Sequence, residues 1–282
     1  MTTVLKVAYI PEHFSTPLFF AEQQGYYTSL GLSIEFIKVI EGSGRLINLL
    51  NSGEVDIAIG LTEAFVADIA KGNKNIKLVD TYVKSPLLWA ISTGAHRDEF
   101  HNEGQLEGQT IGVSRIGSGS YIMSFVLGHS LKFDVPFADF PVLSNFKNLR
   151  DSVNLKFGPI KQIGEIFTPW SSWVITANAD SLAHKKEHIK NFIDAVNSGI
   201  DYFNGHISEA VEYISTNLDY SAEDAKEWTT TVEFNSQIGQ TPLDWENIVE
   251  NTSEILRLAG VITDSEDVVK RRLEANILST NL

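Results

Sequence analysis

Glycines, hydroxyl groups and a cation occur together in one short segment, Ser114-Arg115-Ile116-Gly117-Ser118-Gly119-Ser120. It connects an expected strand, 110–114, to an expected helix, 121–131. Free backbone N–H groups at a helix start, joined by hydroxyl and guanidinium donors, can bind a carboxylate, a sulfonate or a phosphate. The Gly-Lys-Ser/Thr ending of a nucleotide-hydrolase phosphate loop is missing. We therefore predict a general anion site, whose residues are Arg115, Gly117, Ser118, Gly119 and Ser120.

A second turn of this kind, Gly42-Ser43-Gly44-Arg45, follows the expected strand 32–40. Its N–H groups would also attract an anion at the start of the next helix, which makes Ser43, Gly44 and Arg45 candidate ligand contacts. A plain Gly-rich turn, with Ser43 as the helix cap, explains the same residues equally well.

Aromatic and polar side chains follow two other expected strands. His13 and Phe14 come after strand 4–10, where they could stack on or hydrogen-bond a planar ligand, or be ordinary loop residues. Thr62 and Glu63 come after strand 55–59. Glu63 could accept hydrogen bonds from an amino group, although a glutamate in a first helical turn also complements the helix dipole.

Tryptophans are candidate walls of a pocket. Trp89 lies on the expected strand 87–93, and Trp170 lies just before the expected strand 173–177. Trp173 lies within that strand, where core packing is a particularly good explanation. A tryptophan ring can stack on a flat ligand, and core packing accounts for it equally well.

The sequence does not predict catalytic chemistry, a metal or a cofactor. There is no cysteine, so thiolate metal sites and a cysteine nucleophile are excluded. The 7 histidines are scattered. His184 and His188 have a helical i,i+4 spacing, but Lys185, Lys186 and Glu187 between them indicate a solvated surface. We therefore expect a binding protein and not an enzyme.

Charge and hydropathy narrow the choice of partner. The formal net charge of −14 disfavours nucleic acid and anionic membrane surfaces. The sequence contains no apolar run of the roughly 20 residues that a membrane-spanning helix needs. A small-molecule ligand remains the expected partner, and we expect a monomer.

Strands and helices alternate with short Gly-marked turns over the first 90 residues, which predicts an α/β sheet with parallel pairing. Further helices are expected after residue 185. In the first 90 residues the expected strands are 4–10, 32–40, 55–59 and 79–83, and the expected helices are 18–24, 45–51 and 62–70. The helices expected after residue 185 are 188–203, 207–216, 222–234 and 245–259. In such sheets ligands bind beyond the carboxyl ends of the strands.

Four segments in order resemble one solute-binding family. They are Pro17–Tyr27 with Gly31-Leu32-Ser33-Ile34-Glu35, then Gly42-Ser43-Gly44 with Leu49–Ala58, then Leu106–Val113, then Leu258-Ala259-Gly260-Val261-Ile262. The sequence thus resembles the type II periplasmic-binding-protein-like family that serves transporters for sulfonates, taurine, nitrate and thiamine pyrimidine precursors. The eukaryotic thiamine-pyrimidine synthases are related to that family.

The resemblance implies two lobes, each a mostly parallel sheet flanked by helices, joined by a hinge of crossing strands. The large lobe would comprise 1–90 plus 176–282, and the small lobe 91–175. The lobes would close over a polar or heteroaromatic, anionic metabolite in the cleft between them.

The sequence departs from the family at two points. The second "G-x-[IV]-D-A" strand and its helix are missing, so the small lobe looks shortened near 154–155. The cysteine-rich motif and the Lys–His pair of the synthases are also missing, which argues against synthase chemistry. An enzyme of thiamine or pyridoxal-type metabolism on the same scaffold, and a non-binding regulatory relative, remain as alternatives.

The chain begins almost directly with an expected strand and shows no signal peptide. We therefore expect a cytoplasmic protein. The alternative is a periplasmic or extracellular protein whose leader was removed, and only then would a transporter be a partner.

Overall fold

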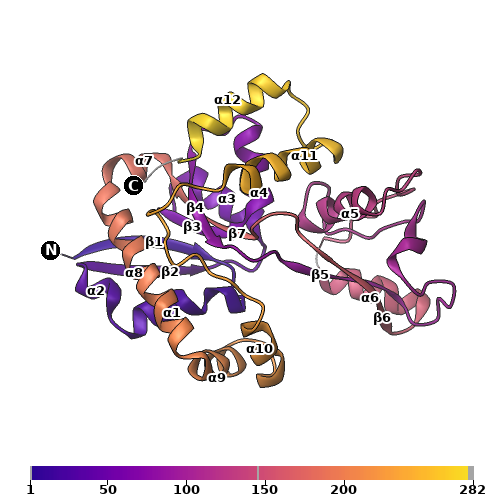
Figure 1. Cartoon of the computed structure of the whole chain (residues 1–282), viewed down its shortest axis with the longest axis horizontal. Helices are drawn as coiled ribbons and strands as arrows, with labels where there is room; N and C mark the ends of the chain where they lie inside the picture. The colour runs from indigo at the N-terminus through magenta and orange to yellow at the C-terminus, as the bar shows by residue number, and fades with distance from the viewer. Residues whose placement is uncertain (1, 145, 279–282) are drawn as a thin grey trace. The chain divides into compact units, whose positions relative to one another are not determined.

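The computed structural model describes residues 2–144 and 146–278, which form two compact units (Figure 1). Unit 1 comprises Met1–Ser85, Trp170–Val249 and Asp264–Leu282, and unit 2 comprises Pro86–Pro169 and Glu250–Thr263. The expected lobes, 1–90 plus 176–282 and 91–175, differ from these units at their bounds. Unit 2 also takes 250–263, which the sequence analysis assigned to the large lobe.

Unit 1 is built on a five-stranded sheet with the order β2-β1-β3-β7-β4. β1 pairs in parallel with β2 and β3, whereas β7 is antiparallel to both of its neighbours, β3 and β4. The alternating strands and helices of the first 90 residues therefore do form a parallel-rich α/β sheet. The strands are β1 (Thr3–Tyr9), β2 (Leu32–Lys38), β3 (Ile57–Leu61), β4 (Ile76–Val83) and β7 (Trp173–Asn178).

Helices cover both faces of this sheet: α1, α2 and α8 pack on one face, and α3, α4 and α12 on the other (Figure 1). Because both faces are covered, the central strands β3 and β7 are almost wholly buried, and β7 is buried along its whole length. The helices of unit 1 are α1 (Thr16–Gln23), α2 (Tyr26–Ser29), α3 (Ser43–Ser52), α4 (Thr62–Ala70), α7 (Ala179–His184), α8 (Lys186–Gly205), α9 (Ile207–Asn217), α10 (Ala222–Thr229) and α12 (Glu266–Asn276).

Glycines allow two kinds of close geometry in unit 1. Gly25 and Gly53 end α1 and α3 with φ values of 71° and 72°, the left-handed conformation that favours glycine, as their positions in the sequence predict. Gly199 on α8 has a different role, because a Cβ atom there would lie 2.3 Å from the Pro17 carbonyl oxygen and 2.9 Å from Ala21 Cβ. The missing side chain lets α1 and α8 pack at short distance.

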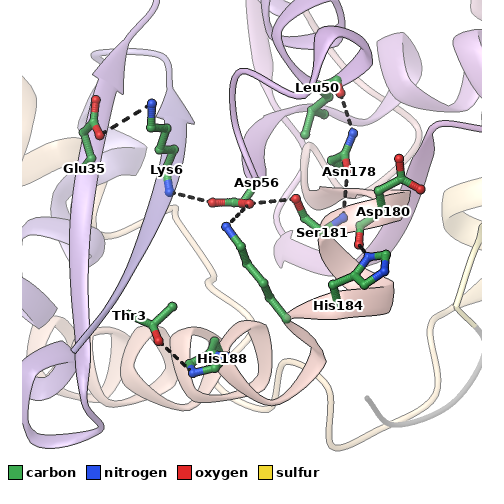
Figure 2. Close-up of polar contacts among 11 residues, drawn as sticks. Thr3, Lys6, Glu35, Leu50, Asp56, Asn178, Asp180, Ser181, His184 and His188 are labelled. Atoms are coloured by element: carbon green, nitrogen blue, oxygen red, sulfur yellow. Dashed lines mark hydrogen bonds and ion pairs between the residues drawn. The ribbon is translucent and has the colours of Figure 1, made fainter. Parts of the chain in front are cut away.

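Asp56 joins three elements at the amino end of β3 (Figure 2). Its carboxylate accepts hydrogen bonds from the Lys6 backbone N–H (3.0 Å), the Ser181 hydroxyl (2.7 Å) and the Lys185 ammonium (2.8 Å). Burial raises the pKa of Asp56, but these bonds outweigh it and hold the pKa below its usual value. The carboxylate therefore fixes α7 and the start of α8 against the sheet.

Unit 2 contains a two-stranded antiparallel sheet of β5 (Leu88–Gly94) and β6 (Ile160–Phe167). Its helices are α5 (Gly119–Ser130), α6 (Phe146–Phe157) and α11 (Asn251–Leu258), with a short 3-10 turn, η2 (Glu103–Leu106). A small core of Phe100, Leu106, Leu127 and Ile163 packs η2 and α5 against β6.

Three expected elements differ from the structure, one of them altogether and two in part. Segment 110–114 is not a strand; it makes only isolated parallel bridges, Thr110 to Asp139 and Val113 to Val142. Helix 222–234 stops at Thr229, because the chain then extends so that Phe234 can bridge Val83 of β4. Segment 245–259 begins with a π-helical turn at Glu246–Glu250 before α11.

Candidate functional site

The loops that should hold a ligand in unit 1 share one edge of the sheet. The parallel strands β1 to β4 end there, and antiparallel β7 begins there. This places the segments after β1 and β3 beside the segment that precedes β7. We call it the carboxyl-end edge.

Five rings gather at this edge and form what we call the aromatic cluster: His13, Phe14, Trp173, Tyr220 and Trp228. The His13 ring centroid lies 4.6 Å from that of Phe14, 4.7 Å from that of Tyr220 and 4.2 Å from that of Trp228. Phe14 adds contacts at 5.2 Å to Trp173 and 5.3 Å to Trp228. The rings come from η1 (His13–Ser15), from β7, from the loop before α10 and from α10 itself.

Two ring nitrogen atoms of the cluster have no hydrogen-bond partner among the described residues. Trp173 is 5% exposed, and its ring N–H is buried without a hydrogen-bond partner among the described residues. His13 Nδ1 is also buried without a hydrogen bond, at 3.7 Å from the Glu12 carboxylate. An indole N–H can only donate, so Trp173 lacks an acceptor that a ligand could supply.

Glu12 brings a negative charge to the rim of the aromatic cluster. Its Oε2 accepts a hydrogen bond from the Tyr220 hydroxyl, and its side chain remains 39% exposed. Partial burial raises the pKa of Glu12, but contacts with His13 and Tyr220 outweigh that effect and leave the pKa below its usual value. Glu12 is therefore ionised at neutral pH, with one oxygen still able to accept a hydrogen bond.

Glu63, Thr62 and Trp170 are buried and form hydrogen bonds with other residues of the chain. The Trp170 ring N–H donates to Glu63 Oε2 at 3.3 Å, and the Thr62 hydroxyl donates to the Ser171 carbonyl at 2.5 Å. Burial raises the pKa of Glu63 to about 7, and hydrogen bonds from its backbone and from Trp170 oppose this rise. The three residues fix the segment before β7 and thereby position Trp173, the first residue of β7, in the aromatic cluster.

The three candidate residues in the Gly42–Arg45 turn have different surroundings in the structure. Ser43 is buried at the carboxyl-end edge, where its hydroxyl accepts from the Leu61 N–H at 3.4 Å, and Gly44 follows it in the first turn of α3. The N-cap of α3 is Gly42, so the interpretation of Ser43 as the cap was wrong. Arg45 is exposed and lines a separate surface pocket of about 330 Å³ with Lys6 and Glu54.

In unit 2 the loop before α5 is already hydrogen-bonded within itself. Ser118 caps α5, and its hydroxyl donates to the Arg115 carbonyl at 2.7 Å. Ser120 Oγ accepts from the Ser114 N–H at 3.0 Å. Gly117 has a φ of 78°, which turns the chain into the first α5 residue, Gly119. The Arg115 side chain is exposed and makes no ion pair within the described residues, so it is the donor that stays available to an anion.

Trp89 belongs to unit 2. Its ring N–H is buried without a hydrogen-bond partner among the described residues, and the residue lines a cavity of about 670 Å³ inside unit 2.

The sequence analysis missed Glu12, Tyr220 and Trp228 as members of the site. Tyr220 and Trp228 lie more than 200 residues from His13 in the sequence, and no motif links them. Their aromatic character was the only available signal. The histidine pair stays apart in Figure 2: His184 contacts the Asp180 carbonyl, and His188 contacts the Thr3 hydroxyl.

Residues 2–144 and 146–278 contain no group of three or more His, Cys, Asp or Glu side chains placed to hold a metal ion. No helix within these ranges combines the length and the apolar character required to span a bilayer.

Comparison with solved structures shows the fold and the family. The Candida albicans CA3427 gene product, which defines a family with the generic periplasmic binding protein fold, is 64% identical, with a TM-score of 0.92 over 99% of this chain and 97% of that chain. Residues 89–173 match the sequence profile of the Ca3427-like PBP family. No protein with a curated description matches the chain.

More distant structures share the fold alone. The alkanesulfonate-binding protein SsuA from Xanthomonas axonopodis pv. citri, bound to MOPS, is 11% identical with a TM-score of 0.67, over 94% of this chain and 96% of that chain. The nitrate-binding protein NrtA from Synechocystis PCC 6803 is 14% identical with a TM-score of 0.69, over 97% and 86%. The resemblance read from the sequence is thereby confirmed, and the chain belongs to the periplasmic-binding-protein-like family that the Candida albicans CA3427 gene product defines.

Proposed function

We propose that the chain binds a small planar heteroaromatic molecule at the aromatic cluster of unit 1, without converting it to a product. The observation that carries the proposal is the Trp173 ring N–H, which is buried among aromatic rings with no acceptor in the described structure. A ring nitrogen or oxyanion of a ligand would satisfy it, and the neighbouring rings would stack on the ligand plane.

Glu12 favours a ligand that also carries an amino group. Its carboxylate is ionised and half-exposed beside His13, so it can accept a hydrogen bond from a ligand N–H. An aminopyrimidine has both features, a ring nitrogen that accepts and an amino group that donates. This chemistry agrees with the thiamine pyrimidine precursors that the sequence resemblance implies.

A small sulfonate or nitrate is the second candidate ligand. The alkanesulfonate-binding and nitrate-binding proteins share the fold, and both of these ligands are oxyanions that could accept from Trp173 and from His13. The Glu12 carboxylate lies close by and would repel an anion, which places the aminopyrimidine first.

Calorimetric titration of purified full-length chain tests the proposal. The probes are 4-amino-2-methylpyrimidine, 2-methylpyrimidine, taurine and nitrate. We expect the aminopyrimidine to bind most tightly, and Glu12→Gln to remove most of its advantage over 2-methylpyrimidine. Equal affinity for both pyrimidines would show that Glu12 does not recognise the amino group. Product formation from a bound probe would contradict binding without turnover.

A further inference from the structure

The two units repeat one pattern of strands, and unit 2 lacks one member of it. In unit 1 the order is β2-β1-β3-β7-β4, with β4 antiparallel to β7. In unit 2, β5 pairs antiparallel with β6 as β7 does with β4, and Thr110–Val113 bridges 139–142 in parallel as β1 does β2. No strand in the described part of unit 2 corresponds to β3, which in unit 1 joins the parallel pair to the antiparallel pair.

The order of elements along the chain leads to the same gap. In unit 1, α3 is followed by β3 and α4 before β4 begins. In unit 2, α6 is followed only by Gly158 and Pro159 before β6 begins. The missing "G-x-[IV]-D-A" segment, which the sequence placed near 154–155, falls instead after α6, because residues 154–155 lie within that helix and Val55-Asp56-Ile57-Ala58 is the corresponding segment after α3 in unit 1.

A cavity of about 670 Å³ lies where that strand would be. Ala90–Gly94 of β5 and Gln109–Gly112 both border it as unbroken runs. Alternate side chains of an extended segment point to opposite faces, so an unbroken run along a cavity presents its backbone edge. Apolar side chains of α5 and α6, among them Met123, Leu127 and Leu149, form much of the remaining wall.

The backbone groups along these edges have hydrogen-bonding capacity to spare. The Ile111 and Val113 N–H groups donate to Asp139 and Pro141 carbonyls, each at 3.0 Å, whereas those of Thr110 and Gly112 have no backbone acceptor among the described residues. β5 pairs only with β6 in the sheet that the structure describes, so its other edge is unpaired as well. An apolar small molecule would fill the volume but leave these groups unsatisfied.

We propose that this cavity receives one extended, apolar peptide strand of a partner protein, which completes the sheet of unit 2. The strand runs parallel to Thr110–Val113 and antiparallel to β5, as β3 runs between β1 and β7 in unit 1. It spans about five residues, the length of β3. Both of its edges then pair, and its side chains alternate between the faces of the sheet.

Residues 54–61 of this chain provide a probe, because they contain the strand that fills the corresponding place in unit 1. The capped peptide Glu-Val-Asp-Ile-Ala-Ile-Gly-Leu, labelled with fluorescein, is titrated into the full chain while anisotropy is measured, and amide hydrogen exchange is followed in parallel. We expect saturable binding and at least tenfold slower exchange of the Thr110 and Gly112 amides. The same peptide N-methylated at Ile57, Ala58 and Ile59 should bind at least tenfold more weakly.

Two variants separate backbone pairing from filling of the cavity. Thr110→Pro removes an N–H that has no backbone acceptor in the described part of the chain and should weaken peptide binding at least tenfold, while Thr110→Ala keeps the N–H and should bind like the wild type. Equal affinity of the N-methylated and unmodified peptides for the wild type would overturn the proposal. So would the absence of protection at Thr110 and Gly112 when the peptide is saturating. None of these results depends on the ligand of unit 1.

Discussion

Replacing Glu63 with glutamine should change the pH dependence of stability in a defined direction. Glu63 is 2% exposed, and burial raises its pKa to about 7, against 4.5 for a glutamate in water. Between these values the folded protein holds a proton on Glu63 that the unfolded chain releases. Stability therefore falls as pH rises from 4.5 to about 7, and below pH 4.5 the group contributes no penalty.

The size of the effect follows from the shift in pKa. A shift of one unit corresponds to about 1.4 kcal/mol, so the rise to about 7 costs the folded state about 3 kcal/mol above that pH. Glutamine resembles the protonated carboxyl in shape and carries no charge. The Glu63→Gln variant should match the wild type near pH 4.5 and exceed its free energy of unfolding by about 3 kcal/mol at pH 8.

Urea denaturation followed by tryptophan fluorescence at pH 4.5 and pH 8 measures the difference. Glu187→Gln, at an exposed position in the first turn of α8, is the matched control, and its free energy of unfolding should differ from that of the wild type by nearly the same small amount at both pH values. If Glu63→Gln differs from the wild type by the same amount at both pH values, the carboxyl is not held protonated by burial and the reasoning fails.

Two further predictions concern packing and charge in unit 1. Asp56→Ala should lower the free energy of unfolding by about 3 kcal/mol at pH 7, because it leaves Lys185 and the Lys6 N–H without their acceptor. Since the pKa of folded Asp56 lies below 3.8, that loss should shrink in urea titrations as pH falls from 3.8 through the lower pKa of the folded state. Gly199→Ala should cost about 1–3 kcal/mol in the same assay, since its Cβ would meet the Pro17 carbonyl at 2.3 Å; an unchanged midpoint would show that α1 and α8 can separate freely.

Local patterns predicted the parts of the fold that depend on neighbouring residues. The helix expected at 62–70 coincides with α4, and Gly25 and Gly53 end their helices as expected, because caps and apolar periodicity act within a few residues. Segment 110–114 has a strand-like pattern but no paired strand on one side, and pairing depends on residues distant in sequence. Placement of β7 between β3 and β4 depends on tertiary contacts for the same reason.

The aromatic cluster, too, could be predicted only where neighbouring residues determine its position. His13 and Phe14 could be identified because they follow a strand, and the carboxyl ends of strands hold ligands. Tyr220 lies in the loop before α10 and Trp228 lies on α10, and nothing in their local sequence indicates the contact with His13. The expectation of a cytoplasmic monomer stays a prediction.

The most direct test of the account is a calorimetric titration of 4-amino-2-methylpyrimidine into the wild type, Trp173→Phe and Trp245→Phe. Phenylalanine keeps an aromatic ring but has no N–H to offer the ligand, and Trp245 lies outside the aromatic cluster. Loss of a hydrogen bond to a buried donor costs about 1–3 kcal/mol, which corresponds to roughly 5- to 150-fold in affinity. The account predicts that loss for Trp173→Phe and wild-type binding for Trp245→Phe. Unchanged affinity in Trp173→Phe, or absence of binding to the wild type, would contradict it.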